Sequence, residues 1–279
     1  MNTDKHGQTR TGMDTHGLTK AQDNGLRIRV LGSGTSMGVP VIGCDCAVCL
    51  SDDPRNKRLR SSIAVEAGGR HLLVDCSIDF RLQMLRWPMP RIDAMLLTHT
   101  HADHINGIDD IRSYNYIQGG PIPLYSTRYF IEDLCSRFPY CFNPMQNGGG
   151  VPQLDLRAVE PGLPFEADGI EVMPLTVMHG RLPILGFRIG RFAYLTDCSA
   201  IPPESEALLE GVETLIISAL RHRPHETHFS LSQSLEASRR LGVRRAFFTH
   251  IADDLDHEAT NVGLPDWARL LHDGQRIEC

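Results

Sequence analysis

Four side chains that commonly bind metal ions lie within one short segment, THTHADH at 98–104. His99 and His101 alternate, so they point the same way while the chain stays extended, and Asp103 and His104 follow. Imidazole suits zinc, iron and manganese, and a neighbouring carboxylate suits the harder ions of that range. Because the segment follows the apolar run MLLT, we expect it at a strand end, where a loop can fold around an ion. A solvated polar loop would show this pattern only by chance.

Three more potential ligands repeat that placement. His179 follows VMPLTVM, Asp197 follows FAYLT and His250 follows AFFT. Each residue alone would be interpreted as an ordinary surface or capped residue. Together with the segment 98–104, they predict that seven side chains gather at the carboxyl ends of buried strands.

Three cysteines form a second cluster, Cys44, Cys46 and Cys49. Three thiolates within six residues can fill three corners of a tetrahedral zinc site, whose fourth ligand must come from elsewhere. The alternative is a redox pair of Cys46 and Cys49, but no thioredoxin-like context surrounds it. We therefore predict a structural zinc. The other thiols are scattered, at Cys76, Cys135, Cys141, Cys198 and Cys279.

The elements that position these residues are short apolar runs separated by turns. Gly68-Gly69 predicts a hairpin turn, and Ser230 with Gln233 has the form of a capping box that opens a helix ended by Gly242. Strands are predicted at 27–34, 61–67, 70–76, 94–100, 170–177, 185–190, 191–198, 214–220 and 245–250. Helices are predicted near 104–117, 127–138, 204–210, 230–241 and 265–273, the last from Pro265 to Gly274.

The order of these elements predicts the fold class. Hairpins come first and strand–helix alternation follows, which favours an α/β protein in which two packed mixed sheets carry helices outside. We expect one domain over 27–279, a polar tail over 1–26 and a loop at 143–152 near the site.

Composition limits the classes of partner. The net charge of −6 argues against a stable nucleic-acid partner, because phosphate contacts usually require a basic surface. No apolar run reaches the roughly 18 residues of a membrane span, and the first 26 residues lack a signal peptide's hydrophobic segment. We therefore expect a cytoplasmic protein with reduced cysteines.

The chain resembles the metallo-β-lactamase superfamily over nearly all of 27–279, with HTHADH as the signature. The resemblance implies an αββα sandwich, two active-site metals (zinc or manganese) and a bridging hydroxide formed near neutral pH. It also implies that Asp197 bridges the metals and that Asp103 serves catalysis as well as binding. One metal would be held by His99, His101 and His179, and the other by Asp103, His104 and His250.

Within that superfamily, the cysteine cluster after LGSGTSMGVP resembles the PhnP-like cyclic phosphodiesterases, as do HGRLPILGFRIG, TDCSAIP and RPHETHFSL. The resemblance implies that His228 is a general acid or a donor to the phosphate. Relatives carry the fourth zinc ligand as a histidine at the position of Asp253. Here Asp253 itself binds the zinc, or His257 takes over, or the site is weaker or empty. A charge argument favours His257, because a carboxylate with three thiolates leaves more uncompensated negative charge.

The helix after the metal segment is expected to support the site. Asp109 or Asp110 would accept the second N–H of a metal-bound histidine. Arg112, Tyr114 and Asn115 either line the substrate pocket or belong to an amphipathic surface helix.

These observations predict metal-dependent hydrolysis of a small phosphodiester, such as a cyclic ribose phosphate or a nucleotide. The sequence leaves open whether the protein forms a homodimer. A tRNA-processing ribonuclease, which shares the LGSGTS-like opening, is the first alternative. Hydrolysis of a thioester or lactam uses the same metals. The last alternative is a non-catalytic binding protein, like the proteins of pyrroloquinoline-quinone biosynthesis that share the CxCxxC cluster.

Overall fold

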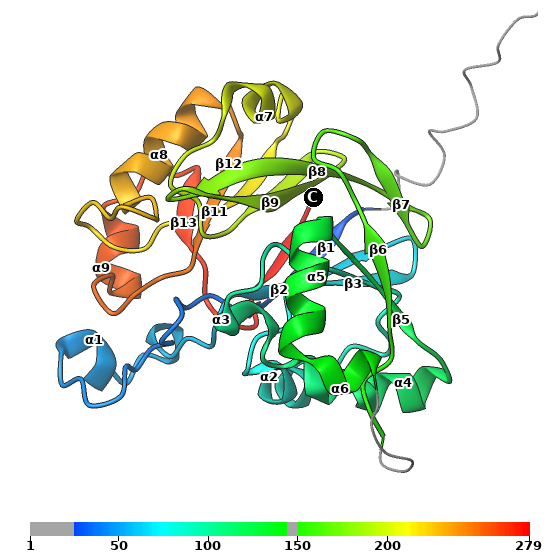
Figure 1. The fold of residues 1–279 in the computed structure, drawn as a ribbon. Helices are drawn as coiled ribbons and strands as arrows, with labels where there is room; N and C mark the ends of the chain where they lie inside the picture. Colours follow the sequence, from blue (N-terminus) through cyan, green and yellow to red (C-terminus); the bar gives the residue numbers. More distant parts are fainter. Residues whose placement is uncertain (1–24, 144–149) are drawn as a thin grey trace, which may run out of the picture.

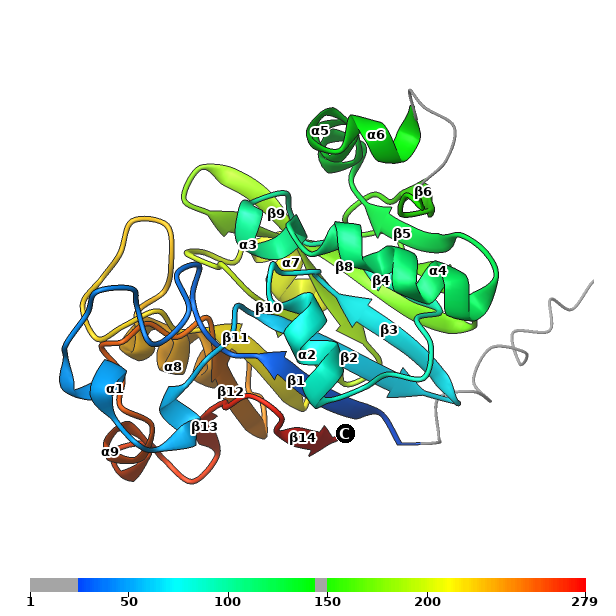
Figure 2. The same ribbon diagram turned by 90° about the horizontal axis from the view of Figure 1, so that it is seen from below.

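Strands with apolar side chains on both faces account for the layered architecture. Val30, Phe187 and Tyr194 are buried between two sheets, whereas Leu73 and Phe80 are buried on the outer side of the first. Helices on each outer side complete four layers in the computed structural model, which describes residues 25–143 and 150–279 (Figures 1 and 2). The predicted fold class, an αββα sandwich of two mixed sheets, is confirmed.

The first sheet has the strand order β14-β1-β2-β3-β4-β5-β6. Its first four strands pair antiparallel, with the predicted turn at Gly68-Gly69, and its strands from β3 to β6 run parallel. They are β1 (Arg27–Gly32), β2 (Ser62–Ala67), β3 (Arg70–Val74), β4 (Ala94–Leu96), β5 (Ile122–Ser126), β6 (Leu154–Ala158) and β14 (Arg276–Glu278).

The second sheet has the order β13-β12-β11-β10-β9-β8-β7. Strands β7 to β10 pair antiparallel, and β10 to β13 run parallel. They are β7 (Phe165–Ala167), β8 (Ile170–His179), β9 (Leu182–Ile189), β10 (Phe192–Leu195), β11 (Thr214–Ser218), β12 (Arg245–Thr249) and β13 (Ala268–Leu270).

Short helices cover the sheets and carry parts of the site. Helix α8 opens with the predicted capping box at Ser230 and Gln233, and it packs on β11 and β12. None of the helices in the described ranges is long and apolar enough to cross a membrane. The helices are α1 (Ala47–Leu50), α2 (Phe80–Arg86), α3 (Ala102–Ile105), α4 (Arg112–Gln118), α5 (Arg128–Arg137), α6 (Pro139–Phe142), α7 (Pro203–Leu208), α8 (Leu231–Arg240) and α9 (His257–Val262).

Two predicted helices differ from the structure. The helix expected at 104–117 is broken around Gly107, where a Cβ would lie 2.0 Å from the Ser77 carbonyl oxygen, so the chain passes too close for a regular turn. The helix expected at 265–273 is wrong: Ala268 and Leu270 are buried alternately, and this segment adds the strand β13 beside β12. Most of the predicted tail and of the predicted loop at 143–152 lies outside the described residues.

Candidate metal centre

The seven predicted ligands converge where strands of both sheets end. His99 and His101 come after β4, His179 is the last residue of β8, and Asp197 and His250 follow β10 and β12. Asp197 and His250 have positive φ angles of 52° and 57°, a left-handed conformation that non-glycine residues seldom adopt. Such outliers cluster at functional sites, and both residues belong to one group of potential metal ligands here.

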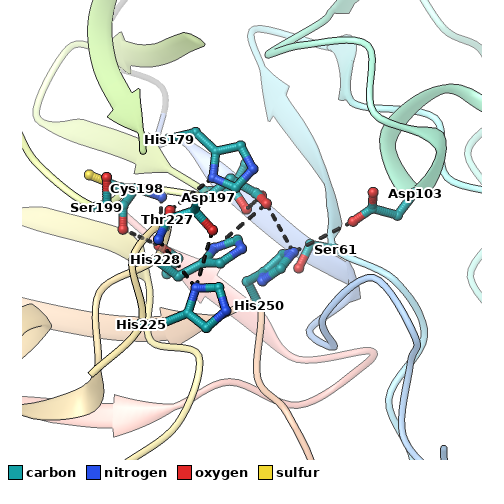
Figure 3. A network of polar contacts seen from close by, with 12 residues as sticks. Ser61, Asp103, His179, Asp197, Cys198, Ser199, His225, Thr227, His228 and His250 are labelled. Atoms are coloured by element: carbon teal, nitrogen blue, oxygen red, sulfur yellow. Dashed lines mark hydrogen bonds and ion pairs between the residues drawn. The ribbon is translucent and has the colours of Figure 1, made fainter. Parts of the chain in front are cut away.

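The side chains form two adjoining groups, and within each the potential ligand atoms lie within 4.8 Å of one another. The Nε2 atom of His104 lies 3.2 Å from one carboxylate oxygen of Asp197. The Nε2 atom of His250 lies 3.1 Å from the other (Figure 3). The resemblance to the superfamily implies the same division, although metal binding by each residue stays a prediction. The groups are His99, His101 and His179, and Asp103, His104, Asp197 and His250.

The hydrogen bonds of the histidines fit a metal centre. The Nδ1 atom of His104 lies 2.7 Å from the Asp75 carboxylate, and the Nδ1 atom of His179 lies 2.8 Å from the Thr227 carbonyl oxygen. Both partners are hydrogen-bond acceptors. Each Nδ1 must therefore donate, which leaves the Nε2 lone pair for another partner. The Nε2 atoms of His99, His104 and His250 are buried, and although those of His104 and His250 lie close to Asp197, none of the three makes a hydrogen bond of regular geometry among the described residues. Because buried polar atoms are nearly always satisfied, these nitrogens fit metal ligands.

A buried aspartate that the sequence interpretation missed orients His104. Asp75, at the end of β3, accepts the His104 Nδ1–H and also the backbone N–H of Thr98 at 2.9 Å. The expectation that Asp109 or Asp110 fills this role is wrong. Asp75 accepts from His104, Asp109 turns instead to Tyr140 and Arg112, and none of the hydrogen bonds found within residues 25–143 and 150–279 joins Asp110 to a histidine. The missed signal was present: Asp75 ends the run RHLLVD, so it has the placement of the other site residues.

Charges are unevenly distributed over the two groups. Burial alone would raise the pKa values of Asp103 and Asp197, but His104 and His250 outweigh burial and hold both values below the usual range. Burial alone would lower the pKa of His104, but Asp103, Asp197 and Asp75 raise it well above the usual value. Three carboxylates around one imidazole thus require positive charge, which a proton or a bound cation can supply.

His228 lies beside the cluster. Its ring stacks on that of His250 at 4.7 Å, and its Nδ1 is 3.8 Å from Asp197 Oδ1. Burial, followed by the nearby His250, lowers the pKa of His228 to about 3, so this buried imidazole is neutral at pH 7. His179, Asp197 and His228 also form a group of potential ligands, so the geometry allows metal binding as well as the predicted donor role.

The second cluster brings the cysteines together with Asp253. Asp253 Oδ2 lies 3.2, 3.6 and 3.7 Å from the sulfur atoms of Cys44, Cys46 and Cys49. The preference for His257 as the fourth member is wrong. Its Nδ1 faces the Arg58 guanidinium at 3.3 Å, because Asp256 caps helix α9 and turns the chain away from the thiols.

The predicted pocket residues of α4 separate into two kinds. Tyr114 and Asn115 are buried and support the fold, the first through the Met89 carbonyl and the second through the Gly120 and Gln153 carbonyls. Arg112 stays at the surface, where it pairs with Asp109 at 2.9 Å. Tyr114 and Asn115 therefore do not line the substrate pocket.

Residues 70–251, more than half of the chain, match the family described as beta-lactamase superfamily domain. The chain belongs to this superfamily, and the fold with its site defines a metal-dependent hydrolase. A crystal structure of a new diphosphatase from the PhnP family is 43% identical with a TM-score of 0.85, covering 91% of this chain and 97% of that one. The chain is thus a PhnP-like protein of the metallo-β-lactamase fold.

Two relatives have names that do not describe a phosphatase. The octanoyltransferase of Porphyromonas gingivalis is 38% identical over 231 residues, which cover 81% of this chain but 46% of that protein. Coenzyme PQQ synthesis protein B of Methylobacterium radiotolerans is 34% identical over 223 residues, which cover 68% of this chain and 72% of that protein. The chain spans about half the length of the octanoyltransferase, so the activity of that whole protein is not carried over.

Proposed function

We propose that the protein hydrolyses small phosphodiesters, such as a cyclic ribose phosphate or a nucleotide, with two divalent ions, zinc or manganese. The observation that carries the proposal is the set of buried, unpartnered imidazole nitrogens among the described residues, beside two ionised carboxylates and with His228 at their edge. The proposed ligands are His99, His101, Asp103, His104, His179, Asp197 and His250.

Two bound divalent ions would supply Lewis acidity and a water acidic enough to attack phosphorus near neutral pH. Asp197 lies where the two groups meet: its oxygens face His104 and His250 of one group, and its carboxylate also lies within 4.8 Å of the potential ligand atom of His179, from the other group. One water is consumed, the P–O bond to the leaving alcohol breaks, and that oxygen takes up a proton. His228, whose ring lies against His250 and His179 at the edge of the cluster, is placed to donate a hydrogen bond from its neutral ring; to deliver the proton itself, it must first be protonated in the complex with the anionic substrate.

Hydrolysis of a phosphoanhydride is the second candidate. It is favoured by the 43% identity to a protein described as a diphosphatase of the PhnP family. Both reactions require the same metals and the same attack on phosphorus, and they differ in the leaving group. A phosphate leaves with little need for a proton, so an anhydride substrate would depend less on His228 than an alkyl ester.

A metal-dependent assay tests the proposal. Protein stripped by a chelator and reloaded with zinc or manganese should hydrolyse bis(p-nitrophenyl) phosphate, and a panel of a cyclic ribose phosphate, a diphosphate and a thioester should show a preference for the phosphorus esters. Metal-loaded protein that cleaves only the thioester would contradict the proposed function.

Replacement of the central carboxylate tests the two-metal assignment. Asp197→Ala should lose active-site metal and nearly all hydrolysis, since the Asp197 carboxylate lies close to proposed ligands of both groups, His104 and His250 on one side and His179 on the other. Metal analysis and the chromogenic assay together measure this. Full activity in Asp197→Ala would sink the two-metal assignment.

A further inference from the structure

A pocket of about 260 Å³ lies on the outer face of the first sheet, at the end of the sheet away from the metal centre. Residues 28 and 30 of β1 are buried between the sheets, so Arg27 and Arg29, which alternate with them, point outward. Both arginines stand near the start of β1, which runs parallel to β3, whereas the metal centre lies beyond the end of β3. Strands β14, β1 and β2 lie side by side here and form the floor of the pocket (Figure 2).

The floor of the pocket carries two rows of paired side chains that differ in charge. In the first row, Arg27 is in register with Glu278 on one side and with Glu66 on the other, and it forms an ion pair with Glu66. In the second row, Arg29 is in register with Arg276 on one side and with an alanine on the other. The charge of the first row is therefore balanced, whereas two arginines face each other in the second row with no acid beside them.

The two arginines of the second row lack strong partners. Like charges directly opposite each other destabilise a sheet, and burial, followed by the nearby Arg276, lowers the pKa of Arg29. Arg29 donates only to the Gly274 carbonyl, over a long 3.5 Å. Arg276 takes part in none of the ion pairs or side-chain hydrogen bonds found within residues 25–143 and 150–279. An anion between the two guanidinium groups would relieve their repulsion and accept from their donors.

The segment after α2 forms a wall beside these arginines. Trp87 lies on the backbone of Gly274, because a Cβ at that glycine would be 2.7 Å from the indole Nε1. The indole N–H can only donate, and it makes none of the hydrogen bonds found in the described part of the chain. Pro88 and Pro90 follow in the same wall, and their fixed φ angles limit how far it can rearrange. The pocket thus combines unused donors with a stiff aromatic surface.

We infer that this pocket is a second anion site, separate from the metal centre, and that it binds the phosphate group of a small organic phosphate. A phosphate monoester carries about two negative charges near pH 7 and several acceptor oxygens, which match two guanidinium groups better than a single carboxylate does. Arg29 and Arg276 hold the phosphate, and Trp87 contacts the organic part. The volume of about 260 Å³ is below the roughly 300–1,000 Å³ of typical small-molecule sites, so the organic part is no larger than a sugar. No step of the proposed hydrolysis involves this pocket, so the inference does not depend on the proposed function.

Tryptophan fluorescence tests the inference, because the chain has only two tryptophans. Trp267 packs against the core beside the second sheet, so Trp267→Phe leaves Trp87 as the only indole. Ribose 5-phosphate titrated into this metal-loaded protein should change the Trp87 fluorescence saturably. Arg29→Gln and Arg276→Gln, each added to Trp267→Phe, should weaken this binding roughly tenfold to a hundredfold, the effect of losing one charge-assisted hydrogen bond.

Three comparisons make the test specific. Arg81→Gln removes the same charge from the exposed surface of α2 and not from the pocket, so it should leave the affinity unchanged. Arg29→Lys should keep part of the affinity, since it retains the charge but not the planar fork. Inorganic phosphate should bind more weakly than ribose 5-phosphate, and equal affinities would contradict the contact between Trp87 and the organic part.

Thermal unfolding of the metal-loaded protein with both tryptophans gives an independent readout. Without phosphate, Arg276→Gln should unfold at a higher temperature than the wild type, because it removes the repulsion between the paired arginines. Ribose 5-phosphate should raise the unfolding temperature of the wild type more than that of this variant, since a ligand of the folded state stabilises it. No response of Trp87 to ribose 5-phosphate, or an affinity that Arg29→Gln and Arg276→Gln leave unchanged, would overturn the inference.

Discussion

Single side chains at the metal centre have little freedom in how they present their nitrogen atoms. The Asp75 carboxylate and the Thr227 carbonyl fix which nitrogen of His104 and of His179 carries the proton. Because these acceptors belong to the fold itself, the Nε2 lone pairs are directed at the cluster without the help of an ion. Preorganisation of this kind is what outer partners of metal ligands provide.

His228→Ala distinguishes a proton donor from a metal ligand. If His228 acts only on the leaving group, the variant should keep its metals while kcat falls roughly 10²- to 10⁴-fold on an alkyl ester. The loss should be smaller on a p-nitrophenyl ester, whose leaving group needs little protonation. Metal analysis beside kinetics on both esters measures this, and loss of bound metal would show that His228 is a ligand.

Asp75→Asn tests the orientation of His104. An amide keeps the shape of the carboxylate, but it cannot accept from both His104 and Thr98 as well as the charged group does. We expect metal affinity to fall roughly tenfold to a hundredfold, measured by competition with a chromogenic chelator. Asp109→Asn is the matched control, because Asp109 bonds Tyr140 at the surface and should leave metal affinity unchanged.

At the scale of the element, strand ends determine where chemistry is possible. The strands at 94–100, 191–198 and 245–250 could be predicted, because each range contains several consecutive apolar residues, a pattern typical of a buried strand. The helix at 265–273 could not be distinguished from a strand, because its start at Pro265 satisfies a helix rule and only pairing with β12 selects β13. Likewise the break at Gly107 depends on the distant Ser77 carbonyl, which no local pattern reveals.

The tip of the β8–β9 hairpin positions His179, and Gly180 makes this possible. Gly180 has φ of +63°, and a Cβ there would lie 2.8 Å from the Thr227 methyl group. Gly180→Ala should therefore push the hairpin away from the loop whose carbonyl holds His179. We expect metal affinity to fall as well as thermal stability, both measured on the purified variant.

Gly68→Ala is the matched control for the hairpin tip. Gly68 also has a positive φ, of +57°, but no atom of the described residues lies within 4 Å of the place that a Cβ would take. The variant should lose only the roughly 1 kcal/mol of a left-handed alanine and keep its metal affinity. Equal metal affinity in both variants would contradict the role given to Gly180.

At the scale of the whole molecule, the site depends on contacts between segments that are distant in sequence. The loop after β1 is bound to the segment after β12 by Thr35 and Ile251, whose backbone groups bond at 3.0 Å. The sequence could predict the seven strand-end residues because they share a local signature. It could not place Asp253 rather than His257 at the cysteines, because that choice depends on how α9 and its cap at Asp256 pack against Asn56 and Arg58.

The cysteine cluster joins these two distant segments, and Asp253 is the residue that completes it in the structure. We expect Asp253→Ala to lose one zinc equivalent and some thermal stability while it keeps the active-site metals, because the Asp253 oxygen lies 3.2 to 3.7 Å from all three sulfur atoms. His257→Ala is the control: it removes a partner of Arg58, so stability falls, but the zinc count should not change. Metal analysis and thermal unfolding of both variants measure this.

Zinc lost from His257→Ala but kept in Asp253→Ala would reverse the assignment. A wild-type protein with only two metals, both in the active site, would rule out the structural zinc, and hydrogen bonds between the cysteines and Asp253 would then join the two segments instead.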